Sequence, residues 1–428
     1  MTALANADAA GASVVGTAEP AGAAAWAREA REAARARLDA EGMPTRRDEY
    51  WKFTRPDELV SDAPPPAAAF VTDEAPVFGG IDRLKIVFVD GVFDPEASDD
   101  LSMAGVEIDR LETASVADGH WAKDVFGVLE ARGQDPVARP LAALNTATAP
   151  DGALIRATGK AKRPVSLIYL HRSDTSDARL HHCVRVEPGA ELTILENGPA
   201  AARFNKVMEV DVADGGAFHH VRAQGRDRER RAVTHMFAKL GTGSMFKSFT
   251  LTANGALTRN ECFIEIVGEN ASAHVAGAAL GDGEFHHDDT VFVVHDAAHC
   301  ESRQVFKKVL RNGARGVFQG KILVRPGAQK TDGYQISQAL LLDGDSEFDA
   351  KPELEIYADD VKCSHGSTSG ALDETALFYL RSRGLPKAEA QDLLVLAFLA
   401  ETIEEIEDGR LADDIRTRLE GWLARRRV

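Results

Sequence analysis

The sequence predicts a mainly β protein whose centre is a parallel β-helix, with helices before and after it. From Ala153 to Val361, short runs rich in Val, Ile, Phe and Thr alternate with turns built on Gly, Asn and Asp. Directly before such runs, a pair of mostly small residues recurs at intervals of 27, 27, 27, 28 and 29 residues. These pairs are Gly189-Ala190, Gly216-Ala217, Gly243-Ser244, Asn270-Ala271, Ala298-His299 and Gly327-Ala328.

Near-constant spacing without sequence identity is typical of a solenoid, in which every turn of the chain bends at the same place. Small residues suit these corners because stacked backbones approach closely and a positive φ is often required. At about 3.3 Å per residue in strands, one turn would cover two or three faces. The same pattern also fits an antiparallel meander, and this alternative stays open on the spacing alone.

Helical patterns flank the strand-rich centre. Ala23–Glu41 has high helix propensity and is followed by Gly42, a typical helix stop. After Gly370, Asp373 is a suitable N-cap for the first of three helical segments. Helices at both ends would cover the exposed strand edges of the terminal turns. The expected parts are a disordered lead-in (1–22), an N-terminal helical and mixed region (23–152), the β-helix core (153–362) and a C-terminal helical domain (363–428).

Composition excludes several classes of function. The net charge of −17 argues against binding of nucleic acid or of an anionic membrane, and no stretch approaches the ~20 apolar residues of a membrane span. The first 25 residues lack the pattern of a secretory signal. The dispersed cysteines form no CxxC pair, which argues against a disulfide framework and against a zinc or iron–sulfur site made by this chain alone. We therefore expect a cytoplasmic protein with reduced thiols.

Histidine doublets occur at His181-His182, His219-His220 and His286-His287. Adjacent residues of a strand point to opposite faces, so the two rings of one doublet cannot bind one metal ion. We interpret the doublets as outward-facing polar positions on strands. Different turns of a solenoid could still bring histidines together, and a metal site made in this way stays open.

The densest group of reactive side chains is Asp359–Gly366, at the junction of the last predicted strand and the C-terminal helices. Cys363 and His365 are two residues apart, so they share one face if the segment is extended. A thiolate and an imidazole are suitable ligands for iron or an iron–sulfur cluster, but two ligands are too few for a closed site. A second chain would have to supply the others. The alternative is that Cys363 packs in the core and His365 caps a helix.

The sequence contains several long motifs: Pro44–Phe53, Leu144–Leu154, Gln329–Asp332 (QKTD), Lys351–Gly366 (KPELEIYADDVKCSHG), Gly370–Glu374 (GALDE) and Leu377–Gly384 (LFYLRSRG). Together they resemble the SufB/SufD family of the SUF iron–sulfur cluster assembly system. The chain length, and the absence of a CxxCxxxC motif, favour the SufD branch over the SufB branch. The resemblance implies an N-terminal helical region, a central right-handed parallel β-helix and a C-terminal helical domain.

The resemblance implies partners and not a substrate. It implies a non-catalytic scaffold that supports cluster assembly and iron acquisition with SufB and the SufC ATPase, to which any ATPase activity would belong. His365, with Cys363 beside it, would face SufB, where a cluster or iron is held transiently and not bound by this chain alone. The isolated chain is also a candidate homodimer. The residues expected to dock SufC are Leu377, Phe378, Tyr379, Arg381 and Arg383, unless the aromatic ones simply pack the helices together.

Two alternatives remain at this stage. One is a SufB-type scaffold that carries the cluster itself. The other is a β-helix polysaccharide lyase, although such enzymes are typically secreted, use acidic clusters for calcium and need a basic residue as proton abstractor. The lack of a signal sequence and the presence of the motifs above count against the lyase.

Overall fold

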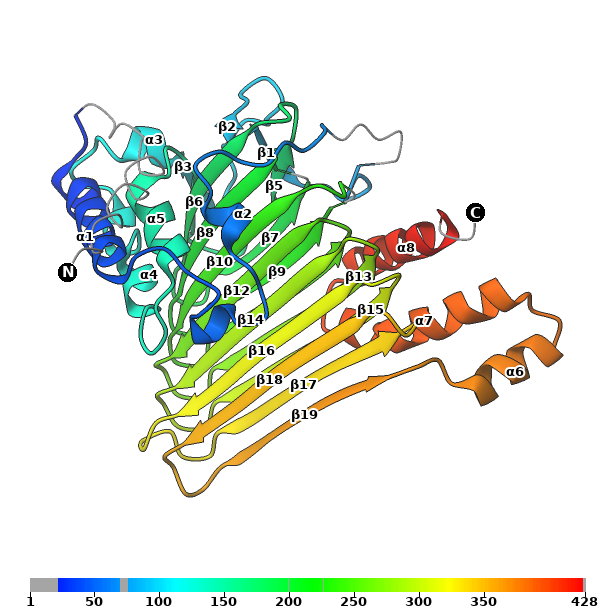
Figure 1. Ribbon diagram of the computed structural model, residues 1–428. Coiled ribbons are helices and arrows are strands. Elements are labelled where there is room, and N and C mark those ends of the chain that lie inside the picture. The colour runs from blue at the N-terminus through cyan, green and yellow to red at the C-terminus, as the bar shows by residue number, and fades with distance from the viewer. Residues whose placement is uncertain (1–21, 70–75, 199, 226, 426–428) are drawn as a thin grey trace, which may run out of the picture.

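The computed structural model describes residues 22–69, 76–198, 200–225 and 227–425. Within these residues the strands form two sheets that face each other across a narrow lumen (Figure 1). The ten-stranded sheet contains β1 (Leu84–Val89), β2 (Val92–Phe93), β5 (Val165–Leu170), β7 (Glu191–Asn197), β9 (Ala217–Gln224), β11 (Met245–Ala253), β13 (Ser272–Asp282), β15 (Glu301–Arg311), β17 (Asp332–Leu341) and β19 (Lys362–Gly370). The nine-stranded sheet contains β3 (Val106–Arg110), β4 (Ala153–Ala157), β6 (Asp177–Val186), β8 (Arg203–Val212), β10 (Arg231–Leu240), β12 (Leu257–Ile266), β14 (His286–His295), β16 (Arg315–Val324) and β18 (Glu347–Ile356).

From β4 onward the chain alternates between the two sheets, and every strand pairs in parallel with the strand two places along. In-register residues of the nine-stranded sheet begin at Arg203, Arg231, Leu257, His286, Arg315 and Glu347, which gives turns of 28, 26, 29, 29 and 32 residues. The predicted parallel β-helix is therefore confirmed, and the meander is wrong. Among the named strands of the described residues, antiparallel pairing occurs only at the start of the sheets, between β1 and β2 and between β3 and β4.

A ladder of residues with positive φ forms one corner of the solenoid. Each of the first five residues donates its backbone N–H to the carbonyl that precedes the next member, as Gly189 does to Asp214 O at 3.0 Å and Asn270 to Ala298 O at 3.2 Å. Four members coincide with the predicted small pairs, whereas Gly215 lies one residue before its pair and Lys330 lies two residues after its pair. The members are Gly189, Gly215, Gly243, Asn270, His299 and Lys330, with φ between 60° and 68°.

Alternate residues of each strand point into the lumen and build the main apolar core, which includes Leu192, Val210, Phe218, Phe246 and Ile264. The residues between them point outward, where apolar residues of the middle strands meet helices. This double burial explains why the strands read as apolar runs.

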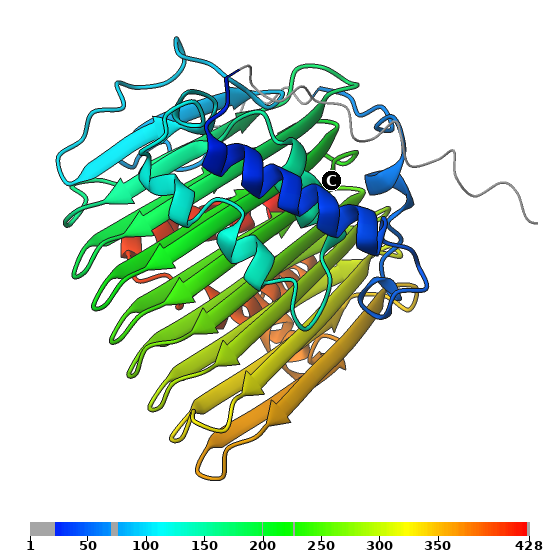
Figure 2. The ribbon, with the colours of Figure 1, turned by 90° about the vertical axis from the view of Figure 1, so that its left-hand side faces the viewer.

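The helices lie on the outer faces of the two sheets and not over the ends of the solenoid (Figure 2). Those of the N-terminal region cover the nine-stranded sheet: α1 (Ala25–Glu41), α2 (Asp57–Val60), α3 (Leu111–Ala114), α4 (Val128–Arg132), α5 (Pro140–Thr148) and the 3-10 turns η1 (Glu49–Trp51) and η2 (Trp121–Asp124). The C-terminal helices α6 (Glu374–Ser382), α7 (Lys387–Ile403) and α8 (Gly409–Arg425) follow β19, and α7 and α8 pack on the ten-stranded sheet.

The expectation that helices cover both ends is therefore wrong. The physical reason is that the outward stripe of the ten-stranded sheet is itself apolar, with Val221, Phe249 and Leu251 packed against Leu399 and Ile403 of α7. Burying this stripe uses the apolar side of the helices.

The predicted domain boundaries fall inside the solenoid. Residue 362 is the first residue of β19, so the ten-stranded sheet continues to Gly370, and the region 23–152 contributes β1, β2 and β3. The predicted lead-in, residues 1–22, lies outside the described residues except for Gly22. Among the helices that the structure describes, none has the length and apolar character needed to cross a bilayer.

Candidate functional site at the open end of the solenoid

Both sheets end at the same end of the solenoid. Within the described residues β18 pairs only with β16, and β19 pairs only with β17, so each presents one unpaired edge. Figure 1 shows these two strands at the lower margin of the molecule. Of the N-terminal region, Glu49 and Tyr50 of η1 reach β18, where they contact Lys351 and Glu353. Exposed edges of this length are templates for pairing with another chain.

Cys363 and His365 lie on β19 at this end, on the face toward the lumen. Parallel pairing sets Cys363 beside Gly333 and His365 beside Gln335. The Gln335 side chain is buried in the lumen, where its Nε2 donates to Gln304 Oε1 at 2.7 Å. Cys363 is half-buried and His365 is exposed. The two side chains therefore share one face, as their spacing requires, while their role stays a prediction.

The Cys363 thiol packs against a small apolar cluster that includes Ile322, Val324 and Ala358. Burial raises the pKa of this thiol, with a further contribution from the Asp332 carboxylate. The free chain thus holds a protonated thiol at neutral pH, whereas a metal ion binds the thiolate. A partner that brings positive charge or further ligands would change this balance.

The predicted docking residues lie on α6. The Asp373 carboxylate accepts hydrogen bonds from the N–H groups of Thr375 and Ala376, which confirms the predicted N-cap. Leu377 is buried, but Phe378 is 73% exposed and Tyr379 is 54% exposed. In this chain the two aromatic side chains therefore do not pack the helices together, and that alternative is wrong.

The two arginines of the same motif, Arg381 and Arg383, are also exposed. The Arg383 guanidinium carbon lies 4.5 Å from the centre of the Tyr379 ring. In Figure 1, α6 projects away from the body of the molecule. The helix thus presents aromatic and cationic groups together on an open surface, although nothing yet identifies what binds there.

The interpretation of the histidine doublets as outward-facing polar positions is wrong for one member of each doublet, since His182, His220 and His287 point into the lumen and are buried. The other members point outward: His181 lies buried beneath the N-terminal helices, whereas His219 and His286 are half-buried. The sequence gives no clear signal of which member faces the lumen, because both faces of such a strand can be covered.

His181, Cys183 and Glu209 come close enough together to be considered as a metal site. The Glu209 carboxylate, however, already accepts hydrogen bonds from His181 Nε2 at 2.7 Å and from the N–H groups of Gly127, Leu129 and Glu130. Because the start of α4 and one imidazole occupy this carboxylate, the group anchors the N-terminal helices to the sheet.

A buried polar network inside the lumen was not predicted. Lys206 Nζ lies 2.5 and 2.6 Å from the two Glu196 oxygens, and Tyr169 Oη and His220 Nε2 contact the same carboxylate at 2.5 and 2.8 Å. Burial alone would raise the pKa of Glu196, but Lys206 and His220 hold it well below its usual value. Charged residues at inward strand positions were the available signal.

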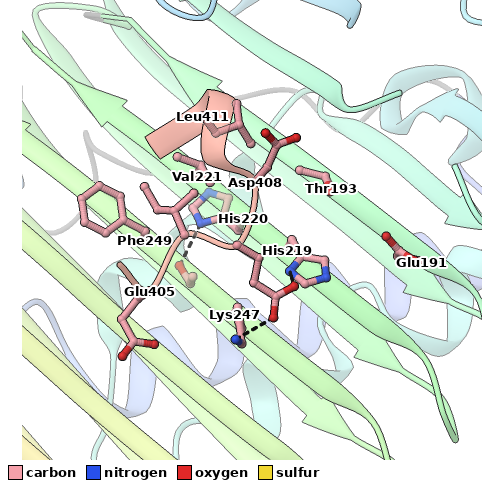
Figure 3. Close-up of a pocket in the computed structure, with 13 residues that line it drawn as sticks. Glu191, Thr193, His219, His220, Val221, Lys247, Phe249, Glu405, Asp408 and Leu411 are labelled. Atoms are coloured by element: carbon pink, nitrogen blue, oxygen red, sulfur yellow. Dashed lines mark hydrogen bonds and ion pairs between the residues drawn. The ribbon is translucent and has the colours of Figure 1, made fainter. Parts of the chain in front are cut away.

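A cleft of about 260 Å³ separates the ten-stranded sheet from the loop that joins α7 and α8 (Figure 3). Ion pairs border it: Lys247 Nζ to Glu407 at 2.6 Å, and His274 Nδ1 to Glu405 at 2.9 Å. A hydrogen bond from Lys247 lowers the pKa of Glu407. On α7 itself, the Glu401 carboxylate pairs with Lys307 of β15 at 2.5 Å. These contacts tie the C-terminal helices to successive turns of the solenoid.

A family model described as "SUF system FeS cluster assembly, SufBD core domain" matches residues 169–398, which is more than half of the chain. The chain belongs to the SufBD family. The match runs from β5 into α7 and includes Cys363, His365 and the exposed aromatic residues of α6. The resemblance seen in the sequence motifs is thus confirmed.

Several relatives of this chain are named as iron–sulfur cluster assembly proteins. It is 29% identical over 400 residues to "Iron-sulfur cluster assembly protein SufD" of Escherichia coli (strain K12), with 88% of this chain and 89% of the relative covered. It is 27% identical over 401 residues to an iron-sulfur cluster assembly SufBD family protein of Synechocystis, with 87% and 86% covered. A SufD protein of Bacillus subtilis is 28% identical over 252 residues, or 57% of each chain. These findings set the polysaccharide lyase aside.

Proposed function

We propose that this SufBD family chain is the SufD-type scaffold subunit of a SUF complex, and that it supports iron–sulfur cluster assembly and iron acquisition with a SufB-type subunit and the SufC ATPase. The observation that carries the proposal is the open end of the solenoid, where two unpaired strand edges accompany Cys363 and His365. The chain itself is a non-catalytic scaffold in this proposal.

The SufB-type partner extends the sheets at β18 and β19. Backbone pairing along both edges would bring the partner's side chains opposite Cys363 and His365. The cluster, or the iron from which it is built, is then a transient cargo held between the two subunits. This explains why one chain supplies only two ligands.

The ATPase docks on α6 and the start of α7. Support comes from Phe378 and Tyr379, which are exposed in this chain. Aromatic side chains are among the groups most often found at the centre of interfaces, so a partner that covers these two residues would explain their exposure. Movement of two ATPase subunits upon ATP binding would pull on these helices. The ion pairs of Glu401, Glu405 and Glu407 with the ten-stranded sheet would pass that displacement to the solenoid.

The first test replaces His365 with Ala in the complex reconstituted with its SufB-type and SufC-type partners. We expect cluster formation to fall by about tenfold or more, while assembly of the complex is unchanged, because an exposed side chain contributes little to folding. Ser364→Ala, on the opposite face of the same strand, is the control. Unchanged cluster yield in His365→Ala would remove the proposed role of this residue.

The second test concerns the docking helix. The double variant Phe378→Ser with Tyr379→Ser is expected to lose co-purification with the ATPase while keeping the unfolding midpoint of the parent chain. Val92→Ser removes another exposed apolar side chain, 69% exposed on β2, and should leave binding intact. Retention of the ATPase by the double variant would place the docking surface elsewhere.

A SufB-type role is the remaining alternative, and one experiment separates the two. The chain alone is incubated with iron and sulfide under reducing conditions and then passed over a desalting column. The scaffold proposal predicts that no coloured cluster stays with the protein. A stable chromophore would favour the cluster-bearing role.

A further inference from the structure

The lumen and its corner after β9 contain more buried cations than carboxylates. Three ion pairs account for most of them: Glu196 with Lys206, Asp227 with Arg230, and Asp289 with Lys308, each at 2.5 Å. A fourth cation, the Arg222 guanidinium, is also buried. Within the described part of the lumen the count of these groups is therefore four cations and three carboxylates.

Arg222 is held mainly by neutral groups. Its two terminal nitrogens donate to Thr234 Oγ1 at 2.9 Å and to Asn260 Oδ1 at 2.8 Å. The Glu196 carboxylate is 3.9 Å away and is already paired with Lys206. Among the described residues, the Arg222 Nε atom has no hydrogen-bond partner.

The other titratable groups of the lumen do not supply the missing negative charge. Burial raises the pKa of the Cys262 thiol to about 12 and that of the Tyr169 phenol well above its usual value. Burial lowers the pKa of His182 to about 3 and also lowers that of His220 and His287, so these imidazoles are neutral. At neutral pH the excess is one positive charge.

Arg222 and Lys206 both line a cavity of about 30 Å³ between the sheets, with Ser248, Asn260 and two paired acidic residues in its wall, Asp289 with Lys308 and Glu261 with Arg259. A cavity needs only about 10–15 Å³ to hold a water molecule. We propose that this cavity binds one small monovalent anion, chloride under ordinary conditions, beside Arg222 and Lys206. The site lies away from the open end and does not depend on the proposed role in cluster assembly.

Size and charge both select this class of ligand. A buried charge without a counter-charge is costly in a low-dielectric interior, so neutralisation by an ion favours the folded state. Burial lowers the pKa of Lys206 to about 8, and repulsion from Arg222 acts in the same direction. A halide ion is only slightly larger than water, so it fits the size of this cavity.

The direct test uses the full chain crystallised with sodium bromide in place of sodium chloride. We expect an anomalous difference peak between the sheets, within about 4 Å of Arg222 or Lys206 nitrogen atoms. In solution, we expect the unfolding midpoint to be about 2 °C or more higher in sodium chloride than in sodium gluconate of equal ionic strength.

Variants give the matched comparison. Arg222→Gln should abolish the bromide peak and the difference between chloride and gluconate, whereas Arg228→Gln, an exposed arginine in the corner after β9, should keep both. If Arg222→Gln does not fold, the bromide peak of the parent chain still decides the question. Water alone in the cavity of the bromide crystal, together with equal midpoints in the two salts, would overturn the proposal.

Discussion

Removing the one carboxylate of the central lumen network should destabilise the chain more than its hydrogen bonds alone suggest. Glu196→Gln keeps the shape of the side chain but leaves Lys206 and Arg222 buried without their shared carboxylate, at 2.5 and 3.9 Å. Breaking a buried ion pair in this way costs about 3–5 kcal/mol. Tyr169 and His220 also lose an ionised acceptor. The expected loss is therefore about 4 kcal/mol in the free energy of unfolding.

Urea denaturation followed by circular dichroism measures this loss. Glu191→Gln is the matched control, because Glu191 lies on the same strand, β7, but pairs with exposed Lys160 at the surface. That change should cost less than about 1 kcal/mol. Adding Lys206→Met to Glu196→Gln should recover part of the stability, since both charges are then gone. A loss below about 1 kcal/mol in Glu196→Gln would refute the reasoning.

Two further predictions concern stability. Burial lowers the pKa of His295 to about 4, so the unfolded chain binds this proton more readily and stability falls as the pH drops from about 6.5 toward 4. In urea denaturation, the free energy of unfolding of the parent chain should fall between pH 7 and pH 4.5, and His295→Gln should make this fall smaller by about 2.5 kcal/mol. A fall of the same size in variant and parent would contradict this. Glu209→Gln should release α4, so the amides of Leu129 and Glu130 should exchange hydrogen faster in the variant than in the parent chain, while the amides of β12 stay unchanged. Equal protection of Leu129 and Glu130 in variant and parent would contradict this prediction.

The architecture was predictable because its signal is repeated. The corners of a solenoid must recur at nearly constant intervals. The regular spacing of Gly189, Gly243 and Asn270 therefore indicates corners, even though each residue alone would not predict one. At the last corner the signal shifts: Lys330, and not Gly327, has the positive φ. The segment between β16 and β17 is longer than the earlier corners, so Gly327 falls too early, whereas Lys330 lies two residues before its strand like every other member of the ladder.

The candidate site was only partly predictable. The two-residue spacing of Cys363 and His365 fixes their common face in any extended segment, so that part needed no structure. Which face they occupy depends on the pairing of β19 with β17. That no helix covers their end in the described chain depends on where the C-terminal helices pack. The buried ion pair of Glu196 and Lys206 was not predictable in this way, because a hydropathy pattern records both residues as polar and does not show that they are buried together.

The side-by-side termination of both sheets restricts what can join this chain. A lone peptide or a single hairpin would hydrogen-bond with only one wall and leave the other wall's amides and carbonyls facing solvent or an unfilled seam. A molecule that is itself two-walled, with matching strand spacing, can satisfy β18 and β19 at once and continue the apolar interior across the joint. Under the proposed function, selectivity for a partner solenoid of similar cross-section follows from this geometry, independent of any particular side chain at the seam.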